Sequence, residues 1–231
     1  QEHSSAASDV YKRQILDIMK ILTRLIIISL VLGLASWVLI QVPSVQDRIL
    51  VAAFSALGSA SKTLPTEDAL SVAVCGSRSP LPSPGRAETC LLIAAGDDLF
   101  VVDIGDGSND NLRSWNINFR NIKAVLITHL HSDHIADLPG LHQNAWVVGQ
   151  RSSKLKVFGP EGIEQFTQGV EMAYAHDYVF RNEHHGDEIA PLEYAGFDTN
   201  VIDLNNPVIF DNSELKITAF RVVHEPIEPA L

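Results

Sequence analysis

Apolar and polar positions divide the chain into one uninterrupted apolar segment and a body of shorter apolar runs. Residues 25–42 (LIIISLVLGLASWVLIQV) contain no formally charged side chain over 18 positions. At about 1.5 Å of rise per residue, a helix of this length is just long enough to cross a hydrocarbon core of about 30 Å. We therefore predict a transmembrane helix or signal anchor within residues 19–42.

Basic residues gather before this segment, at Lys12, Arg13, Lys20 and Arg24. By the positive-inside tendency the N-terminus stays in the cytoplasm, so we expect the body to be membrane-anchored and exported, on the periplasmic or extracellular side. Two alternatives remain open. A cleaved signal peptide would export the body as well, whereas a core helix that is apolar all round would not.

The segments on either side of the apolar segment are not expected to belong to the folded domain. Residues 1–18 are polar and without pattern for most of their length, and they precede Met19, which we take as the natural start; we interpret them as a non-native leader. Residues 43–70 contain Pro43, Pro65 and several serines, and they predict a helical or irregular linker.

The body, residues 71–231, alternates strand-like and helix-like runs. A meander of three strands is expected first, then helices alternating with strands, which implies an α/β layered sheet. The predicted strands are 71–75, 90–95, 99–102, 124–128, 155–158, 208–210 and 215–223, and the predicted helices are 112–119, 139–148 and 160–181.

Charge and cysteine content narrow the function classes. The chain has 28 acidic residues against 17 Lys and Arg, and residues 51–231 carry a formal charge of −12. General attraction to phosphate is thereby disfavoured, so nucleic acid is not the expected partner. Two cysteines exclude a disulfide framework and a cysteine-based zinc module. Cys75 and Cys90 lie on neighbouring strand-like runs, and we take two buried free thiols as the default over a disulfide.

The chemistry is concentrated after the strand at 124–128, in the segment T-H-L-H-S-D-H. His129 and His131 are two positions apart, so both rings project to the same side of an extended segment and can share one cation. Asp133 and His134 follow at the turn into a helix and can bind a second cation. Imidazole and carboxylate ligands without thiolate suit Zn²⁺, or else Mn²⁺ or Fe²⁺. We expect two divalent metal ions, zinc first, which would provide a metal-bound hydroxide for cleaving an ester.

The same segment resembles the H-x-H-x-D-H signature of the metallo-β-lactamase superfamily. The longer stretches ITHLHSDHIADLPGL and KVFGPEGIEQF resemble the ribonuclease Z and arylsulfatase branch, and the resemblance spans residues 72–231. It implies an αββα sandwich of metal-dependent hydrolases, here truncated at the C-terminus and preceded by the transmembrane helix. It further implies that His129 and His131 hold the first metal, and that Asp133, which is also the candidate catalytic residue, and His134 hold the second.

The resemblance assigns two further residues. Asp103 matches a supporting aspartate that orients the metal loop; the alternative is a turn-forming Asp before Gly105. His224 ends a strand-like run and matches a V-x-H segment, so it becomes the third ligand of the first metal. His142 is expected to be a packing or surface residue, and His176, His184 and His185 to lie at a solvated helix end or a pocket wall.

Two classes of function follow. The first is a hydrolase acting on a small-molecule ester, such as an aryl sulfate or a phosphodiester, with a ribonuclease Z-like tRNA 3′-end endonuclease as the alternative. The second is a catalytically silent binding protein of the same fold. The sequence is compatible with a homodimer.

The family also has a bridging aspartate and a final histidine after the position of His224, and the sequence ends seven residues after it. We therefore expect the hydrolase domain to be incomplete and this fragment to be inactive by itself.

Overall fold

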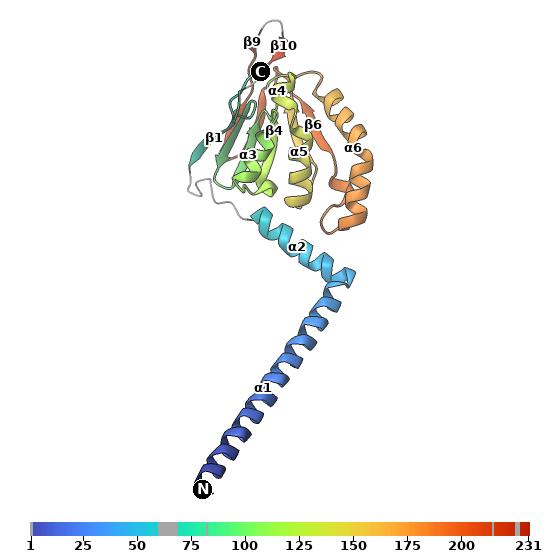
Figure 1. Cartoon of the computed structure of the whole chain (residues 1–231). Coiled ribbons are helices and arrows are strands. Elements are labelled where there is room, and N and C mark those ends of the chain that lie inside the picture. Colours follow the sequence, from blue (N-terminus) through green and yellow to red (C-terminus); the bar gives the residue numbers. More distant parts are fainter. Residues whose placement is uncertain (1, 60–68, 82, 214, 225–226) are drawn as a thin grey trace. The chain divides into compact units, whose positions relative to one another are not determined.

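The computed structural model describes residues 2–59, 69–81, 83–213, 215–224 and 227–231. The chain divides into two compact units, residues 1–50 and 51–231. Figure 1 shows the chain coloured along its sequence.

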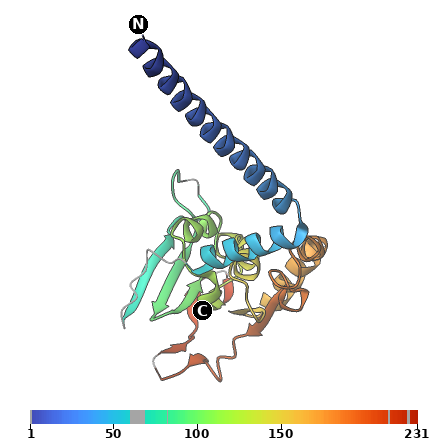
Figure 2. The ribbon, with the colours of Figure 1, turned by 90° about the horizontal axis from the view of Figure 1, so that it is seen from below.

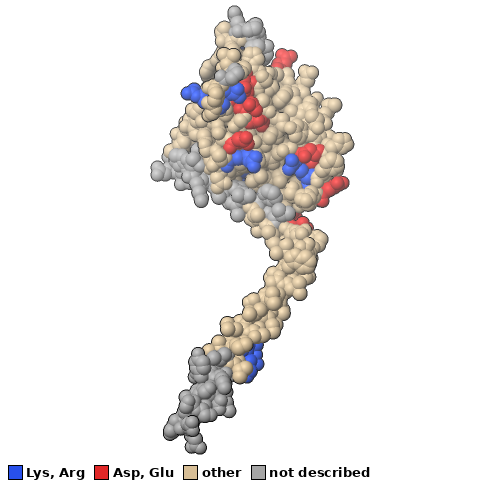
Figure 3. Space-filling model, in the orientation of Figure 1, with Lys and Arg blue, Asp and Glu red and all other residues tan. Residues whose placement is uncertain are grey.

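The first unit is built around helix α1 (Glu2–Ile40). Its stretch Ile18–Ile40 is long and apolar enough to cross a membrane, and none of it is buried; a signal sequence has the same properties. Figure 3 shows one group of basic side chains on the described part of this helix and uncharged surface beyond it. The helix ends at Ile40, two residues before the predicted end, because the chain turns before Pro43 starts α2 (Pro43–Ser59).

The second unit has a six-stranded sheet at its centre. It consists of β1 (Leu70–Gly76), β2 (Cys90–Ala95), β3 (Asp98–Val102), β4 (Ile122–Leu126), β5 (Leu155–Gly159) and β6 (Phe197–Val201), in that spatial order. The first three strands pair antiparallel and form the predicted meander, whereas β3 to β6 pair parallel. The expectation of an α/β layered sheet is therefore confirmed.

Helices cover one face of this sheet. They are α3 (Ser108–Ser114), α4 (Ser132–Ile135), α5 (Leu138–Gln143), the π-helical turn η2 (Asn144–Val148) and α6 (Ile163–His185), with short turns η1 (Phe119–Asn121) and η3 (Leu192–Tyr194) between elements. Leu112, Leu141 and Ile163 are fully buried and join the core formed by the strands. The helices lie over one side of the strands (Figures 1 and 2). This packing fixes the helical layer on the sheet.

The opposite face carries the start of a second sheet. Strand residues point alternately to the two faces, so Val101 enters the helical core while its neighbour Phe100 faces the hairpin of β7 (Val208–Asp211) and β8 (Lys216–Thr218). The rings of Phe100 and Phe210 meet edge to face with centroids 5.0 Å apart. Strands β9 (Val222–His224) and β10 (Ile227–Ala230) form a separate pair.

Several sequence predictions need correction. The strand expected at 124–128 ends at Leu126, and the helix expected at 112–119 occupies Ser108–Ser114, because left-handed Gly107 precedes it and left-handed Asn116 follows it. The single strand expected at 215–223 is divided into β8 and β9, which pair with different partners.

The cysteines are also different from the expected free thiols. Cys75 and Cys90 are fully buried on the paired strands β1 and β2, and they form a disulfide with Cα atoms 5.0 Å apart. The register that places Gly76 opposite Cys90 brings the two side chains together. The bond closes the loop between the first two strands.

Candidate metal centre

The histidine motif lies at the carboxyl end of β4, at the edge of the sheet where parallel strands place their functional loops. Residues 127–131 leave the strand and lead into α4, which begins at Ser132. The backbone N–H of Ile104, which follows β3, donates to the carbonyl of His134 at 2.8 Å. This bond ties the metal loop to the neighbouring strand.

Three imidazoles meet above this edge. One ring nitrogen each of His129, His131 and His224 can be chosen so that all three lie within 4.8 Å of one another. Nε2 of His129 and Nδ1 of His131 are 3.1 Å apart. Two nitrogens that bind one tetrahedral zinc are about 3.3 Å apart, so this spacing suits a single ion. Strand β9 brings His224, which lies 95 positions after His129, to a ring-centroid distance of 4.6 Å from it.

Asp133 and His134 form a second pair of donors beside these rings. Nε2 of His134 lies 3.7 Å from Oδ2 of Asp133, and the rings of His129 and His134 have centroids 3.9 Å apart. Asp133 is only 5% exposed, and its Oδ1 has no hydrogen-bond partner among the described residues. A buried carboxylate oxygen without a donor is costly, and a cation would satisfy it. The residues present therefore fit a divalent metal.

Asp103 holds the metal loop in place through its contacts with Thr128 and His134. It is 3% exposed, and its carboxylate accepts hydrogen bonds from the backbone N–H and the hydroxyl of Thr128, both at 2.8 Å. Its Oδ2 also lies 2.8 Å from Nδ1 of His134. Asp103 adopts a left-handed backbone with φ 56°, which is uncommon for a residue other than glycine. The structure thus brings Asp103 against Thr128 and His134, and its supporting role stays a prediction.

The protonation of the histidines favours cation binding at the first group. Burial lowers the pKa of His129 to about 4, and the positive charges that His134, His224 and His131 would carry add to this effect. His129 is therefore neutral at pH 7 and keeps a lone pair for a metal. Burial also disfavours the charged form of His134, but the hydrogen bond and negative charge of Asp103 outweigh it and raise the pKa of His134.

The disulfide-closed loop and the metal loop both approach Gly105. A Cβ built on Gly105 would lie 2.1 Å from the carbonyl oxygen of Asp133 and 2.4 Å from Cβ of Glu88. Glu88, two residues before Cys90, accepts a hydrogen bond from the N–H of Asp106 at 3.0 Å. Glycine at 105 is therefore what allows both loops to come this close to the segment after β3.

Two contributors were absent from the sequence prediction. The hydroxyl of Thr128 lies 3.1 Å from Nδ1 of His129 as well as bonding to Asp103, and the charge of Glu88 contributes to the raised pKa of His134. Thr128 could have been found, because it opens the histidine motif. Glu88 has no such signal, since only the pairing of β1 with β2 brings it there.

The remaining histidines lie away from this centre. His142 is 1% exposed and packs among Trp146, Tyr178 and Phe197, so of the two roles expected for it, packing and surface, it has the first. His176 is exposed on α6, and His184 and His185 end that helix with ring centroids 4.6 Å apart.

Comparison with known proteins extends this picture. Ribonuclease Z of Mycobacterium marinum (strain ATCC BAA-535 / M) is 30% identical over 164 residues, which cover 70% of this chain and 57% of that protein. Ribonuclease Z of Mycobacterium sp. (strain KMS) is 31% identical over 163 residues, covering 70% and 55%. The chain thus spans a little over half the length of these curated relatives.

A solved structure agrees in fold. The short form of human tRNase Z superposes with a TM-score of 0.50 at 22% identity, covering 66% of this chain and 60% of that one. The family model described as the metallo-beta-lactamase superfamily matches residues 83–215, a range that contains β2 to β7, the histidine motif and the helical layer but not β1. Since this match takes in more than half of the sequence, the chain belongs to the metallo-β-lactamase superfamily.

Proposed function

We propose that this protein is a metal-dependent hydrolase that cleaves an ester bond at the carboxyl edge of β4. The observation that carries the proposal is the convergence of His129, His131 and His224 next to the buried, unpartnered carboxylate oxygen of Asp133. In this assignment the three histidines hold one divalent cation, and Asp133 and His134 hold the other. Such cations would supply Lewis acidity and activate water at neutral pH.

The protein's own groups have distinct tasks in this proposal. Neutral His129 offers a lone pair from a buried position. The buried carboxylate of Asp133 would compensate the positive charge of the cations and would also serve as a proton acceptor during ester cleavage. Asp103 acts as a positioning residue, because its bond to Nδ1 of His134 leaves Nε2 directed towards Asp133.

For the substrate we propose a small-molecule phosphodiester. Hydrolysis of RNA breaks a phosphodiester, and the two relatives described above are named ribonuclease Z, which favours this bond over an aryl sulfate. The formal charge of −12 over residues 51–231 favours a small substrate over a polyanion. A ribonuclease Z-like endonuclease is the second candidate, supported by the identity of 30% over most of the body.

We further propose that α1 anchors the protein in a membrane with the body exported. The apolar stretch Ile18–Ile40 and the basic residues Lys20 and Arg24 support this orientation. The disulfide between Cys75 and Cys90 supports it independently, because such bonds persist in oxidising compartments and are rare in the cytosol.

The function is tested with the full chain purified in detergent. Metal content is measured by mass spectrometry, and turnover is measured with bis(p-nitrophenyl) phosphate, p-nitrophenyl sulfate and a precursor tRNA. We expect bound metal, with cleavage of the first substrate by a form of the protein that also carries the family's bridging aspartate and final histidine. Faster cleavage of the precursor tRNA would favour the second candidate, and bound metal without turnover of any substrate would support the silent binding protein.

A further inference from the structure

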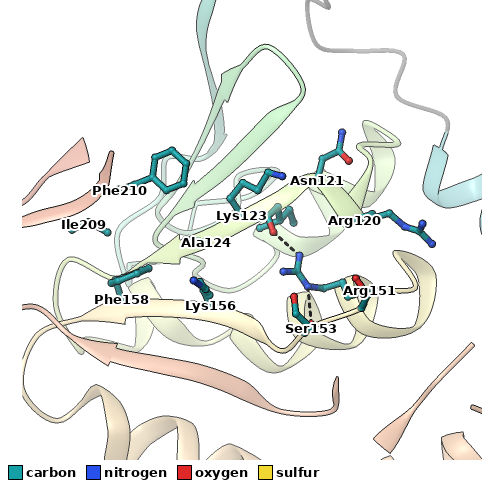
Figure 4. A pocket seen from close by; sticks show the side chains of 12 residues that line it. Arg120, Asn121, Lys123, Ala124, Arg151, Ser153, Lys156, Phe158, Ile209 and Phe210 are labelled. Carbon is teal, nitrogen blue, oxygen red and sulfur yellow. Dashed lines mark hydrogen bonds between the residues drawn. The ribbon is translucent and has the colours of Figure 1, made fainter. Parts of the chain in front are cut away.

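A cavity of about 500 Å³ lies at the opposite end of the sheet from the metal loop. It is lined by the beginnings of β4 and β5 and by β7, whereas the histidine motif follows the end of β4. The cavity extends along the sheet as far as Phe158, which pairs with Leu126 at the end of β4, but none of its lining residues belongs to the histidine motif, so it is distinct from the metal centre. Figure 4 shows it from close by.

The lining of this cavity is strongly basic. Four of its twelve residues are Arg or Lys, and none of those described is Asp or Glu. This distribution is unusual in a chain that has 28 acidic and only 17 basic residues. The cations are Arg120, Lys123, Arg151 and Lys156. Such a cluster in a concave site attracts an anion.

The two arginines are held in place by the backbone. Arg120 donates from Nε to the carbonyl of Gly149 at 2.8 Å. Arg151 donates to the carbonyls of Ile122 and Ser153 through Nη1 and Nε, which leaves its Nη2 without a described partner (Figure 4). A guanidinium fixed in this way is preorganised to bind phosphate oxygens.

The two lysines differ in their partners. Lys123 pairs with Asp98 at 3.1 Å, whereas no ion pair is formed by Lys156 among the described residues. Asp198 lies opposite Lys156 in β6 but does not line the cavity, and the amide of Asn200 approaches its Oδ1 at 3.4 Å. Lys156 is therefore the cation most readily available to a ligand.

The other end of the cavity is apolar. Phe158, Ile209 and Phe210 lie together on the side away from Arg120 and Arg151 (Figure 4). The contact of Phe210 with Phe100 holds this wall against the sheet. A ligand that fills the cavity would need a negatively charged group at one end and a flat or apolar group at the other.

We propose that this cavity binds a small phosphate ester with a planar apolar group, of the size of a nucleoside monophosphate. Its volume falls within the range of about 300–1,000 Å³ that small-molecule sites occupy. The phosphate lies between Arg151 and Lys156, and the planar group lies against Phe158 and Phe210. This inference is independent of the hydrolase function, because none of these residues belongs to the metal centre.

The test uses the full chain in phosphatidylcholine nanodiscs and isothermal titration calorimetry with adenosine 5′-monophosphate. Adenosine, inorganic phosphate and a short-chain phosphatidylglycerol are titrated in parallel. The variant is Lys156→Glu, and its matched control is Lys154→Glu, which makes the same charge change at an exposed residue outside the cavity.

We expect adenosine 5′-monophosphate to bind with a Kd below about 1 mM and more tightly than adenosine or phosphate alone. Lys156→Glu should weaken binding about tenfold and Lys154→Glu less than about twofold, because only the former places a negative charge beside the phosphate. Equal effects of the two substitutions would overturn the proposal, since binding would then be at the metal centre or non-specific. Absence of binding, or tighter binding of the phosphatidylglycerol, would overturn it as well.

Discussion

Oδ2 of Asp103 lies 2.8 Å from Nδ1 of His134, although 31 residues separate them in the sequence. The bond joins the end of β3 to the metal loop after β4, and it determines which ring nitrogen of His134 faces Asp133. A carboxylate that holds a ligand histidine in this way fixes its tautomer and raises its basicity.

We therefore expect Asp103→Asn to weaken metal binding roughly 10- to 100-fold without unfolding the protein. Asparagine keeps the shape and can still accept from the N–H of Thr128, but it removes the negative charge. The pKa of His134 should fall, because Asp103 is what raises it against burial. Chelator competition measures the affinity, and ¹⁵N NMR of the metal-free protein measures the titration. Asp110→Asn, on the exposed side of α3, is the control; an equal loss there would argue against the positioning role.

In a form of the protein that also carries the family's bridging aspartate and final histidine, replacing His131 by Ala should remove bound metal and phosphodiester turnover together. His131 contributes one of the three converging imidazoles, and two remaining nitrogens hold a cation poorly. The matched control is His176→Ala, an exposed histidine on α6, which should keep both properties. Metal analysis and turnover are measured on the same preparations. A His131→Ala protein with full metal content would contradict the ligand assignment.

The metal-free protein should lose stability as the pH falls from about 6.5 to about 4, in part because of His142. Burial, with the charges of Arg151 and Lys154, lowers the pKa of His142 to about 4 in the folded state. Below pH 6.5 the unfolded chain therefore takes up a proton that the folded chain does not, which costs roughly 3 kcal/mol by pH 4.

The variant His142→Gln isolates this contribution. Glutamine does not titrate and can still accept from the N–H of Gly196, which donates to Nε2 of His142 at 2.8 Å. Between pH 7 and pH 4.5, the free energy of unfolding of the parent should fall by roughly 2–3 kcal/mol more than that of the variant. Urea unfolding at both pH values measures this, with His176→Gln as the control. Parallel pH profiles for parent and His142→Gln would refute the assignment.

Removing the disulfide should lower the free energy of unfolding by about 3 kcal/mol. Cys75 and Cys90 are separated by 15 residues, and a cross-link of this span restricts the unfolded chain by about that amount. The double variant Cys75→Ser, Cys90→Ser is compared with the parent by denaturant unfolding. Adding reductant should shift the parent and leave the variant unchanged. Equal stabilities without reductant would show that the bond contributes nothing.

Deleting residues 1–42 should release the body from the membrane fraction, because the apolar stretch Ile18–Ile40 is removed. In cells that carry the full chain, protease added outside a permeabilised outer envelope should digest the body. Protection equal to that of a cytoplasmic marker would contradict export, whatever the result of the deletion.

Local patterns predicted the elements that local interactions determine. The meander and the long helix were recognisable because turn-forming residues bound short apolar runs. Strand β6 was not predicted, because Asp198, Thr199 and Asn200 make its centre polar. It is a strand because β5 pairs with it in parallel register, a long-range interaction that a single segment does not record.

Those parts of the candidate site that are close together in the sequence were predictable, because local patterns record them. His129, His131, Asp133 and His134 are close in sequence, so their ligand chemistry was visible directly. Asp103 came from a family resemblance, and His224 from that resemblance together with its place at the end of a strand-like run, since tertiary structure alone brings both to the motif. The basic cavity was not predicted, because its four cations lie on different segments within an acidic body.

Gly105 determines how freely this sequence can be altered near the metal loop. A single added methyl group would meet the carbonyl of Asp133 on one side and Glu88 on the other. Alanine, the mildest replacement in most loops, is therefore a severe one at this position. Libraries that vary the loop for a new substrate should therefore keep Gly105 constant. Substitutions at exposed residues nearby should be made only in variants that retain it.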